Sequence, residues 1–475
     1  MATTKVNIVD SNKKENKMNK KTKSKKKRII NKIILAVVAI LVVAVLAGSA
    51  YWFSMPSEQR NMLTFMMFGG ENCDNYQEYQ VIGRNDKPLT PTSFEPTATI
   101  SNENVKNVNI ASVTEKLKNE DSTMLKKGNV QTMGIDEYYG WYALADEGAA
   151  GGSYPFGPSP LSYYTAGLAS NLHTQIIKAA EIKEVAIDNV KVEIINTFRW
   201  DDMMSAEGAG FLDLSKVSIM IESSASEDVI QEVKESALNS WAAGEALRNE
   251  TEIIASLVSN GDDWENYRST EGTSTSDESY DGENKLSQIT DVVKKLETLE
   301  VSGKEDEEMS LNFDVMSNMQ FEIYAISESA NNIERPYLKI VTVSTPSEET
   351  WEIYSDEFMG ENDTPLAPTS LEYFTMGTSL CLTSQTTLVS AIMGLDYTDY
   401  RVENQIDYHM ENIDSIDMQS YTDTVYSYIV IESVESEERL EKFFNKSLSL
   451  CFAGEGLKNA TDMDIKIYLN GNKLE

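Results

Sequence analysis

Two cysteines, Cys381 and Cys451, are the side chains of this 475-residue chain best suited to covalent chemistry. A cysteine attacks as its thiolate, so a nearby cation or helix N-terminus must lower its pKa. A second cysteine close in space lets the sulfenic acid formed on the first condense to a disulfide, which prevents irreversible over-oxidation. The pair therefore indicates a redox-active dithiol, with a structural disulfide outside the cytoplasm or two unpaired thiols as alternatives. We interpret the third cysteine, Cys73, as a thiol without a function.

Neither a metal site nor a bound cofactor is expected. The only two histidines, His173 and His409, stand far apart in the sequence, whereas a metal site needs several converging ligands. The same scarcity of histidine disfavours a Ser-His-Asp hydrolase. The segment Gly148-Ala-Ala-Gly-Gly lacks the lysine of a phosphate-binding loop and is interpreted as a turn.

The chain repeats itself at an offset of 210 residues, without a gap over more than one hundred positions. At two positions the repeats differ in chemistry, because Asn171 stands in the place of Cys381 and Trp241 in the place of Cys451. We therefore expect the first repeat to support the site and the second to carry the thiols. Matching residues include Trp141 and Trp351, Asp146 and Asp356, Glu147 and Glu357, Pro155 and Pro365, Leu161 and Leu371, Gly167 and Gly377, and Gly244 and Gly454.

Each repeat has the same predicted order of elements. Strand-like segments lead into a Gly/Pro-rich turn, which is followed by a long apolar helix, predicted over 161–181 and 371–393. The scarcity of charge in these helices predicts that they are buried on most sides. Further strands precede a second helix, predicted over 227–247 and 437–457, with a serine at its N-cap. Strands with two long helices per repeat predict the α+β class.

The start of the long helix carries a family resemblance. The first repeat reads Gly157-Pro-Ser-Pro-Leu-Ser-Tyr-Tyr-Thr-Ala-Gly-Leu-Ala-Ser-Asn171, and the second reads Ala367-Pro-Thr-Ser-Leu-Glu-Tyr-Phe-Thr-Met-Gly-Thr-Ser-Leu-Cys381. These segments resemble the OsmC/Ohr family, in which a Gly-Pro-Ser-Pro-Leu-Glu-type turn leads into an apolar helix with a cysteine. The family's second cysteine lies on a later helix, where this chain has Leu450-Cys451-Phe-Ala-Gly. The resemblance covers roughly 120–255 and 330–470.

The resemblance implies a function and an assembly. Family members reduce organic hydroperoxides as intertwined dimers with interfacial sites, so two OsmC-like repeats are expected to form an intramolecular pseudo-dimer. Cys381 would be the attacking thiolate and Cys451 the resolving thiol. Glu372 would be a carboxylate that shapes the site, and Arg335 is the candidate cation. The implied partners are an organic hydroperoxide or other small apolar ligand and an unknown thiol reductant, with no cofactor.

A second hypothesis belongs to a different class of protein. The chain would be a catalytically inactive OsmC-like ligand-binding or scaffold protein of the bacterial cell envelope. In it, Cys381 and Cys451 would form a static disulfide. The absence of both cysteines from the first repeat favours this hypothesis, whereas their retention in the second repeat favours the enzyme.

Charge and hydropathy predict a membrane anchor near the N-terminus. Residues 1–32 carry a net charge of +10, and since the whole chain carries −35, the remainder carries −45. So acidic a body is not expected to bind nucleic acid. Residues 33–53 are uncharged and long enough to span a bilayer as a helix. Their length favours a retained single-pass anchor over a cleaved signal peptide, and the basic flank predicts a cytoplasmic N-terminus with the body outside.

The predicted organisation has six segments. They are a basic cytoplasmic tail (1–32), a transmembrane helix (33–53), a juxtamembrane spacer (54–100), a first OsmC-like domain without the cysteines (101–256), an acidic linker with a helix (257–309), and a second OsmC-like domain with the cysteine pair (310–475). The helix of the linker is expected within 283–300, where apolar residues recur at helical spacing.

Overall fold

The computed structural model divides the chain into two units, Met1–Arg60 and Asn61–Glu475. It describes residues 60, 81–97, 100–101, 105–117, 124–147, 155–203, 205, 207–260, 293–296, 319–345, 350–360 and 363–474. The predicted tail, the predicted span 33–53 and Cys73 lie outside the described residues. Among the helices of the described part, none is long and apolar enough to cross a membrane.

Two eight-stranded sheets form the second unit. The first runs β1-β5-β4-β3-β13-β14-β8, with β2 paired to β3, and the second runs β16-β15-β7-β6-β10-β11-β12-β9. The first sheet, which we call sheet A, contains β1 (Ile82–Arg84), β2 (Ile100–Ser101), β3 (Val105–Lys116), β4 (Lys126–Thr132), β5 (Trp141–Ala145), β8 (Glu252–Ser259), β13 (Tyr397–Glu411) and β14 (Gln419–Ser433). The second, sheet B, contains β6 (Asn189–Asp201), β7 (Ala209–Glu222), β9 (Val293–Leu296), β10 (Gln320–Ser329), β11 (Lys339–Ser344), β12 (Thr350–Ser355), β15 (Asp462–Leu469) and β16 (Asn472–Lys473).

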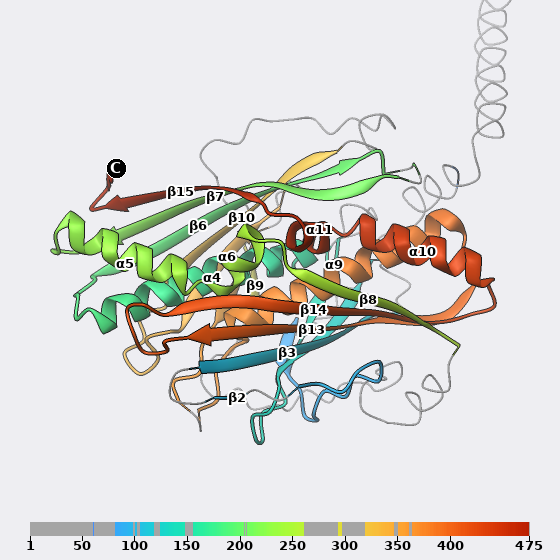
Figure 1. Cartoon of the computed structure of the whole chain (residues 1–475), viewed down its shortest axis with the longest axis horizontal. Helices are drawn as coiled ribbons and strands as arrows, with labels where there is room; N and C mark the ends of the chain where they lie inside the picture. Colours follow the sequence, from blue (N-terminus) through green and yellow to red (C-terminus); the bar gives the residue numbers. More distant parts are fainter. Residues whose placement is uncertain are drawn as a thin grey trace, which may run out of the picture. The chain divides into compact units, whose positions relative to one another are not determined.

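Two long helices lie between the sheets (Figure 1). The helix α4 packs on β6, β10 and β11 of sheet B, α9 packs on β3, β4 and β13 of sheet A, and the two helices pack on each other. This mixed architecture agrees with the predicted α+β class. The helices of the described residues are α4 (Pro160–Ile182), α5 (Glu227–Asn239), α6 (Ala242–Arg248), α9 (Ser370–Met393), α10 (Glu437–Ser449) and α11 (Phe452–Lys458).

The repeats exchange strands, so neither is a self-contained domain. In sheet A, β3 of the first repeat pairs antiparallel with β13 of the second, and in sheet B, β10 of the second pairs with β6 of the first. The C-terminal strands also cross over, because β8 pairs parallel with β14 and β15 with β7. Each sheet therefore contains strands from both of the predicted domains, 101–256 and 310–475.

The crossing of α4 and α9 depends on two glycines at matching positions. A Cβ on Gly167 would lie 2.5 Å from the backbone nitrogen of Phe374, and a Cβ on Gly377 would overlap the backbone of Tyr164. The absence of both side chains lets the backbones approach closely, as small residues do at tight helix contacts. Beside them, the rings of Tyr164 and Phe374 stack at 4.7 Å between centroids.

The second helix of each repeat is interrupted, which corrects the continuous helices predicted over 227–247 and 437–457. The chain leaves the helix after Asn239 or Ser449 and begins a short new helix, with Trp241 or Cys451 at its N-cap. The cap residues take non-helical backbone angles, with ψ of 84° at Trp241 and 103° at Cys451. The helical spacing of apolar residues continues across the break, so the pattern did not reveal it.

Two other boundaries need correction. Part of the predicted spacer 54–100 belongs to the fold, because β1 pairs with β5 and Leu89 is buried. The backbone of this segment is also hydrogen-bonded to sheet A, since the amide of Ser93 donates to the carboxylate of Glu403 on β13 at 2.8 Å. The linker helix predicted within 283–300 is wrong where the structure describes it, because β9 pairs with β12 there. The unpaired edge of β12 provides backbone partners that outweigh a short helical pattern.

Replacing Gly167 by alanine is expected to destabilise the fold. The added methyl group overlaps the backbone of the facing helix, and overpacking of this kind costs about 1–3 kcal/mol. Denaturant unfolding of the Gly167→Ala variant measures the loss. Gly360→Ala is the control, because a Cβ there meets nothing within 4 Å. Equal unfolding free energies for the two variants would contradict the role given to the crossing.

Candidate thiol site

The structure brings the two cysteines together from distant parts of the second repeat. Cys381 lies in the middle of α9, and Cys451 caps the N-terminus of α11. Their sulfur atoms are 3.7 Å apart, and both cysteines are free. The side chains are 1% and 2% exposed, so neither thiol faces bulk water. The break between α10 and α11 makes Cys451 the N-cap of α11, and in this position its sulfur atom faces that of Cys381.

The electrostatic surroundings differ for the two sulfur atoms. Burial raises the pKa of the Cys381 thiol well above its ordinary value, and the adjacent Cys451 raises it further. The backbone amide of Ala453 acts in the opposite direction. Cys381 is therefore protonated at neutral pH. Cys451 accepts a hydrogen bond from the backbone amide of Gly454, with nitrogen 3.4 Å from sulfur.

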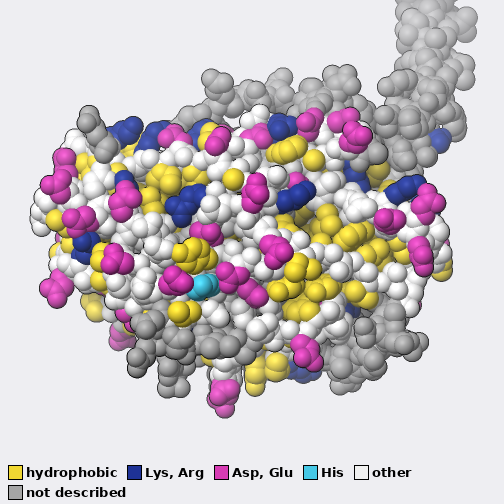
Figure 2. All heavy atoms as spheres, in the orientation of Figure 1, with side chains coloured by type: hydrophobic (Ala, Val, Ile, Leu, Met, Phe, Trp, Pro, Cys, Tyr) yellow, Lys and Arg dark blue, Asp and Glu magenta, His cyan; other side chains and the backbone are white. Residues whose placement is uncertain are grey.

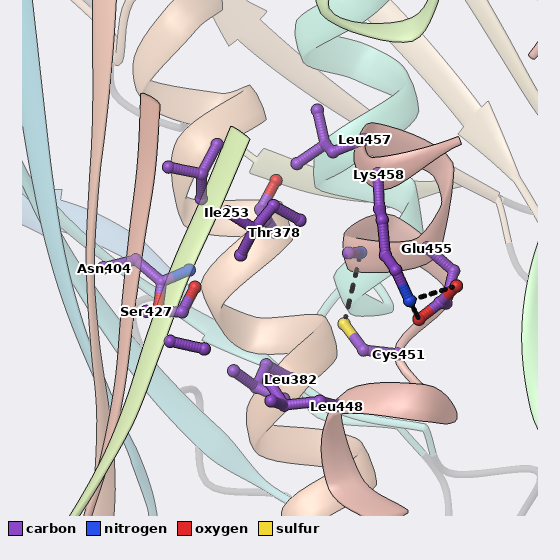
Figure 3. A pocket seen from close by; sticks show the side chains of 13 residues that line it. Ile253, Thr378, Leu382, Asn404, Ser427, Leu448, Cys451, Glu455, Leu457 and Lys458 are labelled. Atoms are coloured by element: carbon purple, nitrogen blue, oxygen red, sulfur yellow. Dashed lines mark hydrogen bonds and ion pairs between the residues drawn. The ribbon is translucent and has the colours of Figure 1, made fainter. Parts of the chain in front are cut away.

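A pocket of about 190 Å³ adjoins Cys451 but is not lined by Cys381 (Figure 3). It lies between β8, β13, β14, α9 and the α10–α11 corner, and most of its lining is apolar. Lys458, the one cation among the described residues that line it, has a side chain 62% exposed and binds Glu455 at 3.2 Å. On the face of the molecule that carries β8, hydrophobic side chains gather beside this strand (Figure 2). The pocket therefore leads from the surface to the Cys451 thiol.

A tyrosine of the first repeat completes the surroundings of the thiols. Tyr164 on α4 is fully buried, and within the described part of the chain its hydroxyl has no hydrogen-bond partner. A Cβ on Gly456 of α11 would lie 3.6 Å from this hydroxyl oxygen. Burial raises the pKa of Tyr164 well above its ordinary value, with Cys381 and Cys451 adding to the effect. The hydroxyl thus remains a proton donor beside the sulfur atoms, and the second repeat has Phe374 at the matching position.

The matching place in the first repeat is filled by packing and hydrogen bonds. Asn171 accepts a hydrogen bond from the amide of Ala243 at 3.2 Å, the same relation that Cys381 has to Ala453. The indole of Trp241 covers Gly244 and donates to the carbonyl of Leu168 at 3.1 Å. This half therefore has no thiol, and a large side chain occupies the region that corresponds to Cys451.

Glu372 lies in the first turn of α9, whereas Cys381 lies in the middle of this helix. It completes a capping box with Thr369 at the N-terminus of α9. Its carboxylate also accepts hydrogen bonds from the hydroxyl of Tyr138 at 2.8 Å and from the amide of Thr132 at 3.0 Å. Burial raises the pKa of Glu372, although these donors oppose the shift. Nine residues of helix separate it from Cys381 by about 13 Å, so the predicted role beside the thiolate is corrected to capping α9 and joining it to β4.

Arg335 is likewise engaged away from the thiol pair. Its guanidinium donates to Asp356 at 2.9 Å, to Asp363 at 2.7 Å and to the carbonyl of Glu357 at 3.2 Å. These contacts hold the loop that precedes α9. The guanidinium of Arg335, the candidate cation for the thiolate, is therefore bound to the carboxylates of this loop. Arg84, which sequence reasoning missed, packs on Trp141 with its guanidinium carbon 4.3 Å from the ring centroid. No sequence signal distinguished it, since it lies within the segment 54–100 that was interpreted as a spacer.

Comparisons with known proteins give one structural match to report. No protein-family model matches the chain, and no curated protein matches it. Among solved structures, the chain is similar to an OsmC-like hydroperoxide resistance protein from Jannaschia sp. CCS1, at 17% sequence identity and a TM-score of 0.22. The match covers 29% of this chain and 88% of that chain.

Glu372→Gln is expected to lower stability without altering thiol chemistry. The glutamine side chain would place an N–H group against the Tyr138 hydroxyl and the Thr132 amide, which both donate to the carboxylate of Glu372. Loss of a hydrogen bond to a charged group costs about 1.5–3 kcal/mol. Denaturant unfolding measures this loss, with the exposed Glu438→Gln as a control that should stay within about 0.5 kcal/mol. If the stability were unchanged and hydroperoxide oxidised Cys451 more slowly, Glu372 would have a role in the thiol chemistry.

Proposed function

We propose that this protein is an OsmC-like, thiol-dependent redox protein that reduces organic hydroperoxides. The observation that carries the proposal is the pair of free, buried sulfur atoms 3.7 Å apart beside a largely apolar pocket. Two thiols at this separation need only a small approach to form a disulfide, whose sulfur atoms are about 2.05 Å apart. The pocket gives an apolar hydroperoxide a path to one of them.

We assign the roles of the two cysteines in the reverse of the order expected from the sequence. Cys451 lines the pocket, whereas Cys381 lies behind it with a raised pKa. The Cys451 thiolate attacks the hydroperoxide, so that a sulfur–oxygen bond forms, the oxygen–oxygen bond breaks, and the leaving alkoxide takes a proton to become an alcohol. The Cys381 thiol then condenses with the Cys451 sulfenic acid, releasing water and forming the disulfide. An external dithiol supplies the two electrons and two protons that restore both thiols.

The exchange of strands supports a pseudo-dimer made within one chain. Each repeat supplies one central helix and part of both sheets. The thiols come from the second repeat and the Tyr164 hydroxyl from the first, so the site draws on both halves. We further propose that residues 33–53 anchor the protein in the membrane of a cell envelope and that the body lies outside the cytoplasm.

One observation favours the second candidate, a non-catalytic ligand-binding or scaffold protein with a static disulfide. Within the described part of the chain, the strongest influences on the pKa of Cys381 include no cation, and Glu147 raises that pKa further. In this alternative the pocket would hold a small apolar ligand, and the cysteines would only join α9 to α11. Chemical reduction and hydroperoxide turnover separate the two candidates.

Cys451→Ser is expected to abolish the reduction of cumene hydroperoxide by a dithiol, because it removes the thiol that lines the pocket. Cys381→Ser is expected to keep a single turnover and to accumulate a sulfenic acid on Cys451, since no resolving thiol remains. Mass spectrometry after trapping with dimedone locates the modified residue.

The parent chain and a Cys73→Ser variant are the controls, and both should turn over repeatedly. Dimedone on Cys381 in the Cys451→Ser variant would reverse the roles assigned to the cysteines. If the parent consumed no hydroperoxide and its disulfide resisted mild reductants, the enzyme would be excluded in favour of the second candidate.

Tyr164→Phe is expected to lower kcat/KM for cumene hydroperoxide by about 10–100-fold, because the site loses a hydrogen-bond donor for the leaving oxygen. The unfolding free energy should not fall, since the lost hydroxyl has no partner in the described part of the chain. Tyr163→Phe is the matched control: its hydroxyl donates to the carbonyl of Leu144 at 2.8 Å, so stability should fall while activity persists. Full activity in Tyr164→Phe would remove this residue from the mechanism.

A further inference from the structure

The side-chain amide of Asn404 is buried without a hydrogen-bond partner in the described part of the chain. The side chain is 0% exposed, and neither its nitrogen nor its oxygen has a hydrogen-bond partner among the residues that the structure describes. Buried amides in folded proteins are nearly always paired, because an unpaired one loses its hydration without compensation. A buried amide without partners therefore indicates that its hydrogen-bonding groups serve a bound molecule.

The amide belongs to the lining of the pocket beside Cys451. Asn404 and Ser427 lie on one side of this space and Cys451 on the other (Figure 3). The strand β13 alternates its side chains between the two faces of sheet A. Val402 and Ile406, two residues away on either side, share the face of Asn404 and are fully buried. Asn404 therefore replaces an apolar core residue where the core opens into the pocket.

The matching place in sheet B shows which residues the same row holds in the other half of the fold, where Ile194 and Val217 are buried. In sheet A, Asn404 pairs with Ser427, which pairs with Ala255. The positions offset by 210 residues form the same row in sheet B, where Ile194 pairs with Val217 and Val217 with Ile465. On the facing helix, Thr378 matches Leu168.

Every member of the row in sheet A is thus smaller or more polar than its counterpart. The apolar version of the row is fully compatible with this fold, as sheet B demonstrates. A polar row beside the pocket is consequently a property of the pocket and is not required by the architecture.

The size and lining of the pocket define the ligand that would fit. A cavity of about 150 Å³ binds benzene in another protein, so about 190 Å³ accommodates a substituted ring. Ile253, Leu382 and Leu457 offer an apolar wall. At the buried end, Asn404 offers one donor and one acceptor side by side, which a carboxamide complements with two parallel hydrogen bonds. The charged residues of the lining, Glu455 and Lys458, are paired with each other, so the ligand needs no charge.

We propose that this pocket binds a small neutral molecule with an apolar body and a carboxamide group, and that Asn404 recognises the carboxamide. The inference deepens the proposed function, because a hydroperoxide on the same body would meet Cys451 across the pocket. Binding itself does not depend on thiol chemistry. The test therefore uses molecules without a peroxide, so that the two proposals can fail separately.

The probe is 4-fluorobenzamide, compared with 4-fluorocumene, whose isopropyl group has the shape of the carboxamide but makes no hydrogen bonds. Titration of the full-length, reduced protein is followed by fluorine NMR. Asn404→Leu, which keeps the branched shape and the number of heavy atoms, is expected to weaken 4-fluorobenzamide about tenfold, as loss of two neutral hydrogen bonds predicts. The affinity for 4-fluorocumene should not fall. Ile194→Leu, at the matching position of sheet B, is the control and should change neither affinity.

Stability provides an independent readout. Because Asn404→Leu removes unpaired polar atoms, its Tm is expected to rise by about 2–4 °C. A lower Tm would show that Asn404 is a structural partner and would overturn the proposal. The same conclusion would follow if neither probe bound to the parent, or if Asn404→Leu left the ratio of the two affinities unchanged. Selective binding in a chain without hydroperoxide turnover would sustain the pocket and exclude only the enzyme.

Discussion

The close crossing of α4 and α9 at Gly167 and Gly377 is the constraint on which the rest of the structure depends. Both helices are buried along most of their length, and each covers a different sheet. A side chain at either glycine would push the helices apart and separate the two sheets with them. The closeness of this contact also brings Tyr164 of one repeat to the corner of α11 in the other. The thiol site is therefore a product of the crossing as well as of the cysteines.

The two halves share an architecture but divide the chemistry. The first repeat fills its version of the site with Trp241 and Asn171, both hydrogen-bonded, and keeps an apolar row on sheet B. The second repeat has two thiols in these places and a pocket lined by an unpaired amide. A duplicated fold needs only one competent site when the partner half supplies structural support. Loss of the thiols in one half is thus compatible with their retention for function in the other.

Much of the helical framework was predictable from the sequence, whereas the exchange of strands was not. The Gly/Pro-rich turn and the low charge of the segment that follows it locate α4 and α9, because these signals are local. Strand pairing between repeats leaves no such mark, since alternation indicates a strand but not its neighbour. The break before Cys451 was missed because apolar spacing continues through it. Asn404 was overlooked because an asparagine within a strand reads as a solvent-facing residue, and Glu372 was misplaced because its position along the helix says nothing of its partners on β4.

The central claim is that one chain holds one dithiol that reacts as a unit within the pseudo-dimer. Its most direct test is a stoichiometric titration of the fully reduced, full-length protein with cumene hydroperoxide in the absence of reductant. The account predicts one equivalent of alcohol per chain, the loss of two of the three thiols, and an intramolecular bond between Cys381 and Cys451 in peptide mapping. Retention of all three thiols, or a disulfide that joins separate chains, would contradict it.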